Sequence, residues 1–369
     1  MGPGLRRTLL PHAISPEPPP AGAQVREYRG LSMGTSWSAR VAQPAAAPHP
    51  PAHLSTHSSA HSAAHSSAHS SAHSAVHLSD DLHVGLQAQL DDVVAQMSHW
   101  DPASDLGRFN RAPAGTWQVL PPAFFQVLAF ALDVCRDSGG ACDPCAGALV
   151  NLWGFGPVNR YDEPGFTAPT PEQAHGALPA ARVRLDPVSH SALQPGGVQL
   201  DLSAVAKGYG VDRLARWLEG QGIRDYLVEV GGELRGAGLK PDGQPWWVAL
   251  EGVDDAPSGD DGIVAALHGL AVATSGDYRR FFLHDGRRHA HTIDPRSGMP
   301  IENGLASVTV VAASCMACDA WSTALTVLGP VDGLALAERR GIAARFVVRT
   351  AGGLVEHLSS HMRAMLEQA

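Results

Sequence analysis

The sequence lacks the features of several common protein classes. Its 369 residues carry a formal net charge of −9, and no basic run appears. Because contacts to nucleic-acid phosphates depend on excess Lys and Arg, this balance argues against a nucleic-acid-binding protein. No segment approaches the roughly 18 consecutive apolar residues of a membrane helix, so we expect no transmembrane span.

Export signals are also missing from the first residues. The opening stretch MGPGLRRTLLPHAISPEPPPAGA has two arginines but no apolar core of signal-peptide length. The first cysteine is Cys135, so no lipid-attachment cysteine lies near the start. We therefore expect a cytoplasmic protein, and an exported form stays open if a leader precedes this sequence.

Cysteines are few and odd in number, five in all, which argues against a full disulfide framework. Cys142 and Cys145 form one C-x-x-C pair, and Cys315 and Cys318 form another. Two such pairs could make a tetrahedral zinc site, but the pairs of zinc ribbons lie close in sequence and these do not. We expect buried thiols, with a structural zinc as the alternative.

A low-complexity tract interrupts the early part of the chain. Histidine recurs at every fourth position from His53 to His77, separated almost only by Ser and Ala. On a helix this spacing would align the imidazoles, which bind transition metals. The tract has little apolar surface to bury, so we expect a disordered insertion over 43–80, with adventitious metal binding as the alternative. Residues 1–26, rich in Pro, Gly and Ala, predict a disordered tail.

The remaining residues mix helical and strand-like patterns. Helical spacing of apolar residues marks 82–97, 124–135 and 211–218. Strand-like composition marks 25–41, 225–234, 246–250, 307–312 and 344–349. There is no regular βαβ alternation and no G-x-G-x-x-G turn, so the order favours an α+β architecture over a doubly wound sheet.

A carboxylate and two hydroxyls could meet near the start of a late helix. Ser322 and Thr323 follow Asp319 by three and four residues, which places all three on one helical face. Oxygen ligands of this kind suit Mg²⁺. Helix capping is the alternative, since Asp, Ser and Thr are common at helix starts.

A second candidate is the segment DLSAVAKGYG at 201–210, which joins an extended stretch to a helix. Glycine and small residues let a ligand approach the backbone, and helix N-termini favour anions. Lys207 could neutralise phosphate charge there. An ordinary strand-to-helix turn with an exposed lysine is the alternative.

Two aromatic side chains are further candidates. His291, in HTIDPRSG, could exchange protons near neutral pH, although a structural histidine is the commoner case. Trp100 follows a predicted helix and could stack on a planar ligand, with a core tryptophan as the alternative.

Together and in this order, these segments resemble the ApbE family of FAD:protein FMN transferases. The resemblance covers residues 27–365, which we expect to form one flavin transferase domain interrupted by the 43–80 insertion. The matching stretches are LSMGTSWSARV, MSHWDPASDLGRFNRA, ACDPCAGALVNLWGFGP, LDLSAVAKGYGVDRL, YLVEVGGELRGAG, AVATSGDYRRFF, HTIDPRSGMP and VTVVAASCMACDAWSTALTVLGP.

The resemblance implies a fold and a set of site residues. The fold would be a two-lobed, T-fold-related α+β architecture, with mixed or antiparallel sheets, flanking helices and an FAD cleft between the lobes. The implied FAD contacts are Met33, Trp100, Ala141, Cys142, Asp143, Asp201, Lys207 and the segment from His291 to Ile293. The implied Mg²⁺ ligands are Asp319, Thr323 and an oxygen of Ala204, with Ser322 as a further candidate.

The resemblance also implies a reaction. A Ser or Thr hydroxyl of an acceptor protein, a redox subunit with a short flavinylation motif, would attack FAD at the phosphorus on the FMN side, and AMP would leave. Such transfers rely on alignment and charge neutralisation, here by Mg²⁺ and Lys207, with Asp319 holding the ion. A carboxylate or His291 would take the hydroxyl proton. An FAD pyrophosphatase, or a non-catalytic flavin or metal carrier, is the alternative.

Two departures from the family pattern leave details open. Trp100 stands where the family often has Tyr, which leaves the balance between transfer and hydrolysis undecided. Cys142 and Cys145 stand where the family commonly has apolar or hydroxylic residues. If the fold brought Cys315 and Cys318 close to them, a redox-sensitive pair beside the flavin would become conceivable.

Overall fold

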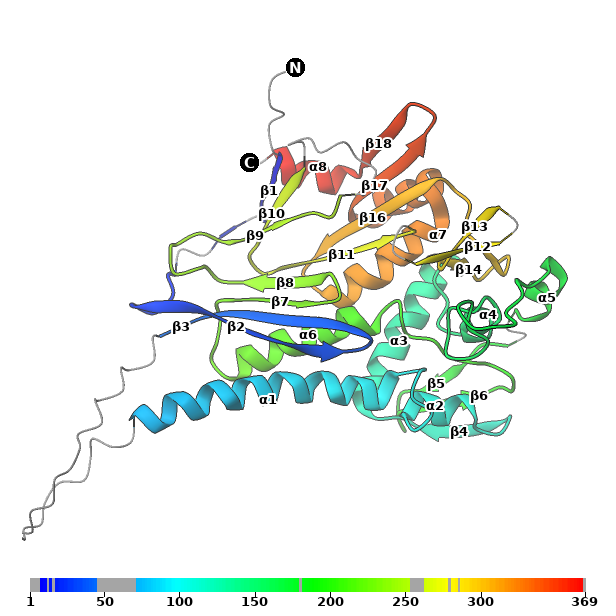
Figure 1. Ribbon diagram of the computed structural model, residues 1–369, viewed down its shortest axis with the longest axis horizontal. Coiled ribbons are helices and arrows are strands. Elements are labelled where there is room, and N and C mark those ends of the chain that lie inside the picture. The colour runs from blue at the N-terminus through cyan, green and yellow to red at the C-terminus, as the bar shows by residue number, and fades with distance from the viewer. Residues whose placement is uncertain are drawn as a thin grey trace, which may run out of the picture.

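An eight-stranded sheet forms the centre of the computed structural model (Figure 1). The structure describes residues 7–11, 13–14, 17–44, 71–178, 181–252, 262–277, 280–284 and 286–367. All neighbours in the sheet are antiparallel. The strand order is β18 (Gly353–Leu358), β17 (Ala343–Thr350), β16 (Leu305–Ala312), β11 (Leu270–Gly276), β8 (Glu233–Ala237), β7 (Tyr226–Val230), β3 (Thr35–Pro44) and β2 (Ala23–Ser32).

Both faces of the central strands of this sheet are covered, so side chains of both alternating sets are buried there, as in β16. In β7, Tyr226 and Val228 enter one core, whereas Leu227 enters another. The first face carries the helices α1 (Ser71–Met97), α6 (Ala206–Gly220) and α7 (Cys315–Arg340) (Figure 1). The second face packs on α8 (Ser360–Glu367) and on a small sheet of β1 (Arg7–Leu9), β10 (Ile263–Leu267) and β9 (Trp246–Ala249).

Helix α1 connects this sheet to a second lobe. Leu86 and Leu90 pack in the core of the large sheet, whereas Val93 and Met97 pack in the second core. The helices of this lobe are α2 (Asp105–Asn110), α3 (Pro122–Asp137), α4 (Gly147–Leu152) and α5 (Pro171–Gly176). Its strands are β4 (Thr116–Val119), β6 (Ser191–Gln194) and β5 (Arg184–Asp186), followed by the hairpins β12 (Phe281–His284) with β13 (Arg287–Ala290) and β14 (Ile293–Asp294) with β15 (Met299–Pro300).

The predicted α+β class with mixed or antiparallel sheets is confirmed, since the large sheet is antiparallel and the sheet of β1, β10 and β9 is mixed. The helices predicted over 124–135 and 211–218 are α3 and α6, and the strands predicted over 246–250, 307–312 and 344–349 are β9, β16 and β17. The 25–41 segment is the β2–β3 hairpin. It turns at Met33 and Gly34, with φ angles of 52° and 72°, the left-handed pair that a two-residue hairpin favours.

The prediction of one strand over 225–234 was wrong, because this segment ends one strand and begins the next. Gly231 and Gly232 have φ angles of 62° and 100°, which no regular strand contains. The chain reverses there between β7 and β8.

The expected disordered segments were also too broad. Arg7–Leu9, inside the expected tail, form β1, because they pair in parallel with β10 and Arg7 forms an ion pair with Glu356. The segment 43–80 also overlaps two regular elements, since β3 reaches Pro44 and α1 begins at Ser71. The histidines from His53 to His69, and the metal binding expected of them, lie outside the described residues.

In the described part of the chain, α7 alone is long and apolar enough to cross a membrane by length and composition. More than half of that apolar stretch is buried, and residues of α7 pack in the core of the large sheet. A core helix passes the same test, so this feature is weak support for a membrane span.

Candidate functional site

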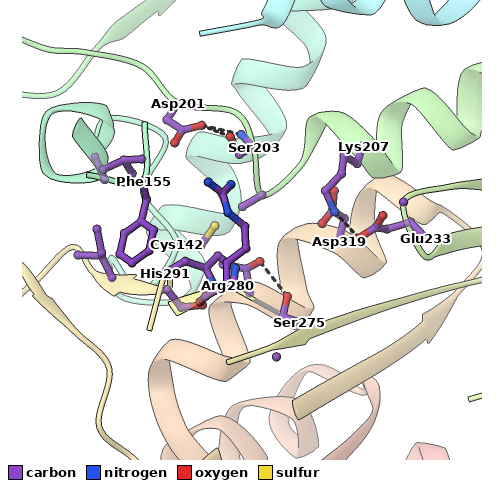
Figure 2. A pocket seen from close by; sticks show the side chains of 18 of the residues that line it. Cys142, Phe155, Asp201, Ser203, Lys207, Glu233, Ser275, Arg280, His291 and Asp319 are labelled. Carbon is purple, nitrogen blue, oxygen red and sulfur yellow. Dashed lines mark hydrogen bonds and ion pairs between the residues drawn. The ribbon is translucent and has the colours of Figure 1, made fainter. Parts of the chain in front are cut away.

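A cavity of about 340 Å³ opens where elements of the large sheet meet segments of the second lobe. Strands, helix starts and loops from distant parts of the sequence contribute to it (Figure 2). Its lining residues are Met33, Thr35, Ala141, Cys142, Asp143, Ala146, Val150, Phe155, Asp201, Ser203, Ala204, Lys207, Gly231, Glu233, Thr274, Ser275, Gly276, Arg280, His291, Thr292, Ile293, Pro295, Asp319 and Thr323.

All the site residues named from the sequence line this cavity except Trp100 and Ser322. The Ser322 side chain is fully buried, and its hydroxyl donates to the carbonyl oxygen of Asp319 at 2.9 Å. Trp100 is 44% exposed, and its ring contacts His99 and the guanidinium of Arg160. The structure therefore places neither side chain at the cavity, and the FAD contact implied for Trp100 and the Mg²⁺ contact implied for Ser322 stay predictions.

One side of the cavity is a polar wall, formed by Lys207, Glu233, Asp319 and Thr323. Lys207 lies at the start of α6, Glu233 is the first residue of β8, and Asp319 lies in the second turn of α7. The ammonium of Lys207 donates to Glu233 Oε1 (Figure 2). The backbone N–H of Gly208 donates to Asp319 Oδ2 at 2.9 Å.

The polar wall exists because α6 and α7 approach each other very closely. A Cβ on Gly208 would lie 2.3 Å from the carbonyl oxygen of Cys315, so only glycine fits here. Ser314 caps α7 by accepting from the N–H of Ala317, and the helix therefore begins one turn before Asp319. The prediction from the sequence that the helix starts at Asp319 was wrong, because α7 starts one turn earlier, at Cys315.

Burial and mutual proximity shift the pKa values of the polar wall. Burial raises the pKa of Asp319, although the ammonium of Lys207 and the N–H of Gly208 oppose it. Burial also raises the pKa of Glu233 to about 7, against the effect of Lys207. Burial lowers the pKa of Lys207, but the charges of Asp319 and Glu233 outweigh it and raise the value. A charged lysine therefore lies between two carboxyls, and a further cation would favour their ionised forms.

The donor atoms at this wall fit a hard divalent cation. Asp319 offers a carboxylate, and Thr323 a hydroxyl whose oxygen lies 3.1 Å from Ser275 Oγ. Ala204 lines the same cavity and has a backbone carbonyl to contribute. Mg²⁺ takes oxygen ligands and retains positions for water or phosphate, so an incomplete oxygen set open to a cavity suits it.

The structure argues against the alternative zinc site. Among the described residues, which include all five cysteines, no group of three or more His, Cys, Asp or Glu side chains could hold a metal ion, and every cysteine is free. Cys315 and Cys318 pack in the core of the large sheet, whereas Cys142 and Cys145 pack in the second core. The two C-x-x-C pairs therefore do not form one site.

The cysteines near the cavity are protonated thiols. Burial raises the pKa of Cys135 to about 11 and that of Cys145 to about 12. Burial raises the pKa of Cys142 further still. The neighbouring Asp143 forms an ion pair with Arg182 at 2.5 Å. Since the thiolate is the reactive form, this environment does not suit a redox-active pair.

Phe155 and His291 lie on the other side of the cavity (Figure 2). We call them, together with the lining residues Val150 and Ile293, the aromatic wall. The Phe155 ring lies 5.5 Å from that of Phe282 and 6.3 Å from that of His291, measured between centroids. Apolar side chains and ring edges of this kind suit a planar aromatic ligand.

The imidazole of His291 has a defined orientation. Its Nδ1 lies 3.0 Å from the carbonyl oxygen of Arg280, which can only accept, so we assign the proton to Nδ1. The basic lone pair is then on Nε2. The backbone N–H of His291 donates to the same oxygen, at 3.1 Å.

Glu233 and Phe155 are among the cavity residues that the sequence reasoning did not name as site residues. They lie in YLVEVGGELRGAG and NLWGFGP, segments that were noted for a strand and for the family resemblance but not for chemistry. No spacing within either segment pointed to chemistry, because the partners of both residues come from other parts of the chain. The conspicuous Gly231-Gly232 turn directly before Glu233 was the available signal.

Comparisons with known proteins agree with this geometry. The model of the ApbE family matches residues 33–346. An FAD:protein FMN transferase of Haemophilus influenzae is 38% identical over 298 residues, which cover 78% of this chain and 84% of that protein. The apo crystal structure of Pseudomonas stutzeri flavinyl transferase ApbE matches with a TM-score of 0.76 at 35% identity, covering 93% of this chain and 97% of that one. A cavity with an oxygen-rich polar wall, the family match and these likenesses lead to one conclusion: the chain belongs to the ApbE family.

Proposed function

We propose that this chain transfers the FMN part of FAD to a Ser or Thr hydroxyl of an acceptor protein and releases AMP, with Mg²⁺ as the metal. Family membership and the named relatives support flavin transfer to protein. The observation that carries the chemical detail is the meeting of a polar wall and an aromatic wall in one cavity.

The two walls match the two ends of the reacting part of FAD. The isoalloxazine ring would lie against Phe155 and Ile293, where apolar contacts replace water. The diphosphate would face the polar wall. Lys207 would neutralise part of its charge, which phosphoryl transfer requires because the protein contributes mainly alignment and electrostatics.

Asp319, Thr323 and the carbonyl oxygen of Ala204 would hold Mg²⁺ at this wall. When bound, the ion supplies neutralisation of charge on the diphosphate. The raised pKa of Asp319 fits this role, because burial penalises its negative charge and a bound cation offsets that penalty.

His291 would accept the proton of the attacking hydroxyl. A bond forms between the acceptor oxygen and the phosphorus on the FMN side, the bond from that phosphorus to the bridging oxygen breaks, and AMP leaves. The proton passes to Nε2, because Nδ1 already donates to Arg280. Water in place of the acceptor would give FMN and AMP.

The test is incubation of the full chain with FAD, Mg²⁺ and a protein carrying the family's Ser/Thr motif, followed by intact mass and AMP. We expect the acceptor to gain one FMN with AMP formed, and an acceptor with Ala in place of that hydroxyl to gain nothing. Free FMN and AMP without labelling would indicate an FAD pyrophosphatase. Tight FAD binding without turnover would indicate a carrier.

The histidine tract supplies a second control. A variant with serine at each histidine from His53 to His77 should transfer FMN as well as the natural chain does. Loss of all transfer in this variant would contradict the proposal that the cavity alone performs the reaction.

A further inference from the structure

The proposed reaction leaves one buried charged side chain of the polar wall without a role. Glu233 is 3% exposed and lines the cavity. Its Oε1 accepts from Lys207, and its Oε2 is buried with no hydrogen-bond partner among the described residues. Burying a carboxylate with one of its two oxygens unpartnered destabilises a fold, so such a group points to a specific task.

We propose that Glu233 is a positioning residue that holds the ammonium of Lys207 away from Asp319, and so keeps the Asp319 carboxylate available to the divalent cation. This inference rests on the proposed function, which assigns Asp319 to Mg²⁺. It gives Glu233 no contact with the cation or with FAD.

The choice of partner by Lys207 carries the argument. Both carboxylates line the cavity beside Lys207 and raise its pKa, Asp319 through its charge and Glu233 through its charge and a hydrogen bond. Yet the hydrogen bond of Lys207 goes to Glu233 (Figure 2). The ammonium therefore lies within electrostatic reach of Asp319 but is bonded elsewhere.

Without Glu233, the lysine and the metal would compete for one carboxylate. The N–H of Gly208 already occupies Asp319 Oδ2, which leaves Oδ1 as the principal ligand atom. Lysine carries a compact charge on a flexible four-carbon stem, so it can turn toward a nearby carboxylate when its partner is lost. An ammonium at Oδ1 would displace the cation.

Rigid elements hold Glu233 in place. It begins β8 and pairs with Val230 of β7 across the Gly231-Gly232 turn. A Cβ on Gly231 would lie 2.9 Å from the Thr35 side chain, so the turn packs tightly on the β2–β3 hairpin. The backbone of Glu233 is therefore held by the pairing of β8 with β7, whereas Lys207 and Asp319 belong to the helices α6 and α7.

The test compares Glu233→Gln with a charge-matched double variant, Glu233→Gln with Lys207→Met. Two quantities are measured on the full chain: the Mg²⁺ concentration giving half of the Mg²⁺-induced rise in Tm without FAD, and that giving half-maximal AMP release from FAD. Asp319→Ala sets the baseline for Mg²⁺ bound elsewhere, including on the histidine tract.

We expect Glu233→Gln to raise both half-saturating concentrations about tenfold, since it leaves a charged lysine without its partner. In the double variant, the half-saturating Mg²⁺ concentration measured by Tm should return to within about twofold of that of the natural chain, because the competing ammonium is gone. Lys207→Met alone should bind Mg²⁺ at least as well as the natural chain.

Three outcomes would overturn the inference. Unchanged half-saturating Mg²⁺ concentrations in Glu233→Gln would show that Glu233 is not needed to keep Lys207 away from Asp319. Equal weakening in the single and the double variant would show that Glu233 acts on the cation itself. A natural chain that responds to Mg²⁺ in neither measurement would show that no cation uses Asp319. A natural chain that is stabilised by Mg²⁺ but forms no AMP refutes the proposed function instead, and the Tm series still decides this inference.

Discussion

The polar wall and the aromatic wall face one cavity but are built differently (Figure 2). Lys207, Glu233 and Asp319 each belong to a helix or strand of the large-sheet lobe, and each has a defined polar contact. Phe155 lies in the loop after α4 and His291 in the loop before β14. Charge neutralisation at a phosphate depends on positions fixed to fractions of an ångström, whereas ring packing tolerates more movement. Variants of the two walls should therefore fail in different ways.

The largest effect is expected for Asp319→Ala. Flavin transfer should fall by about a thousandfold or more, since metal-based charge stabilisation contributes several kcal/mol. AMP release measured against Mg²⁺ concentration checks this. Asp319→Asn keeps an acceptor for the N–H of Gly208 but loses the charge, so it should be almost as inactive while its Tm without Mg²⁺ stays close to that of the natural chain. Full activity of Asp319→Ala would contradict the assignment of the Mg²⁺ site to the polar wall.

Gly208→Ala should damage the polar wall without altering any charged group. The new Cβ would meet the carbonyl oxygen of Cys315 at 2.3 Å and force α6 away from α7. We expect a loss of about 1–3 kcal/mol in the free energy of unfolding and about a hundredfold in transfer rate. Urea unfolding and AMP release measure the two. Gly220→Ala, at the other end of α6 with open space around it, is the control and should have little effect.

Phe155→Leu should weaken FAD binding with little change in kcat, because the Phe155 ring binds the isoalloxazine and, unlike His291 of the same wall, takes no part in the proposed proton transfer. Loss of ring contacts is worth about 0.5–1.5 kcal/mol, so the Kd of FAD should rise roughly three- to tenfold. Quenching of flavin fluorescence measures it. Phe166→Leu changes the same ring cluster away from the cavity and should leave the Kd unchanged. A fall in kcat with constant Kd would contradict the assignment of Phe155 to binding of the flavin ring alone.

Trp100→Ala should have the smallest effect. Its ring is tilted against His99, lies under the guanidinium of Arg160 and does not line the cavity. We therefore expect the Kd of FAD to change by less than about threefold, which is less than the loss of one full stacking contact would cause. The same fluorescence titration tests this. A loss of more than about tenfold would show that the ring covers the flavin in the complex, as the family resemblance implied.

The two walls also differ in how far the sequence could predict them. Asp319 and Thr323 lie four residues apart on one helix, so helical periodicity alone predicted that their side chains share a face. The same periodicity also added Ser322, which does not line the cavity, because which side of the helix faces the cavity depends on how α7 packs against β11. There the hydroxyl of Ser275 lies 2.8 Å from Ser322 Oγ.

Contacts between distant parts of the chain could not be predicted from the sequence, again because they depend on how the elements pack. Glu233 meets Lys207 only because the large sheet places β8 beside α6, and Phe155 meets Phe282 only through packing of the second lobe. β1 was missed because three residues in a Pro-rich tail carry no periodicity, and their strand character comes from pairing with β10. Local spacing predicts elements, whereas the pairing of distant elements needs the fold.

The most direct test of the account is a crystal structure of this chain with FAD and Mn²⁺ in place of Mg²⁺, with the metal located by anomalous scattering. We expect one strong peak between Asp319 and Thr323, in contact with the diphosphate, with Lys207 still bonded to Glu233 and the isoalloxazine ring against Phe155. A metal peak away from Asp319, or a flavin ring packed on the polar wall, would contradict the assignment of the two walls.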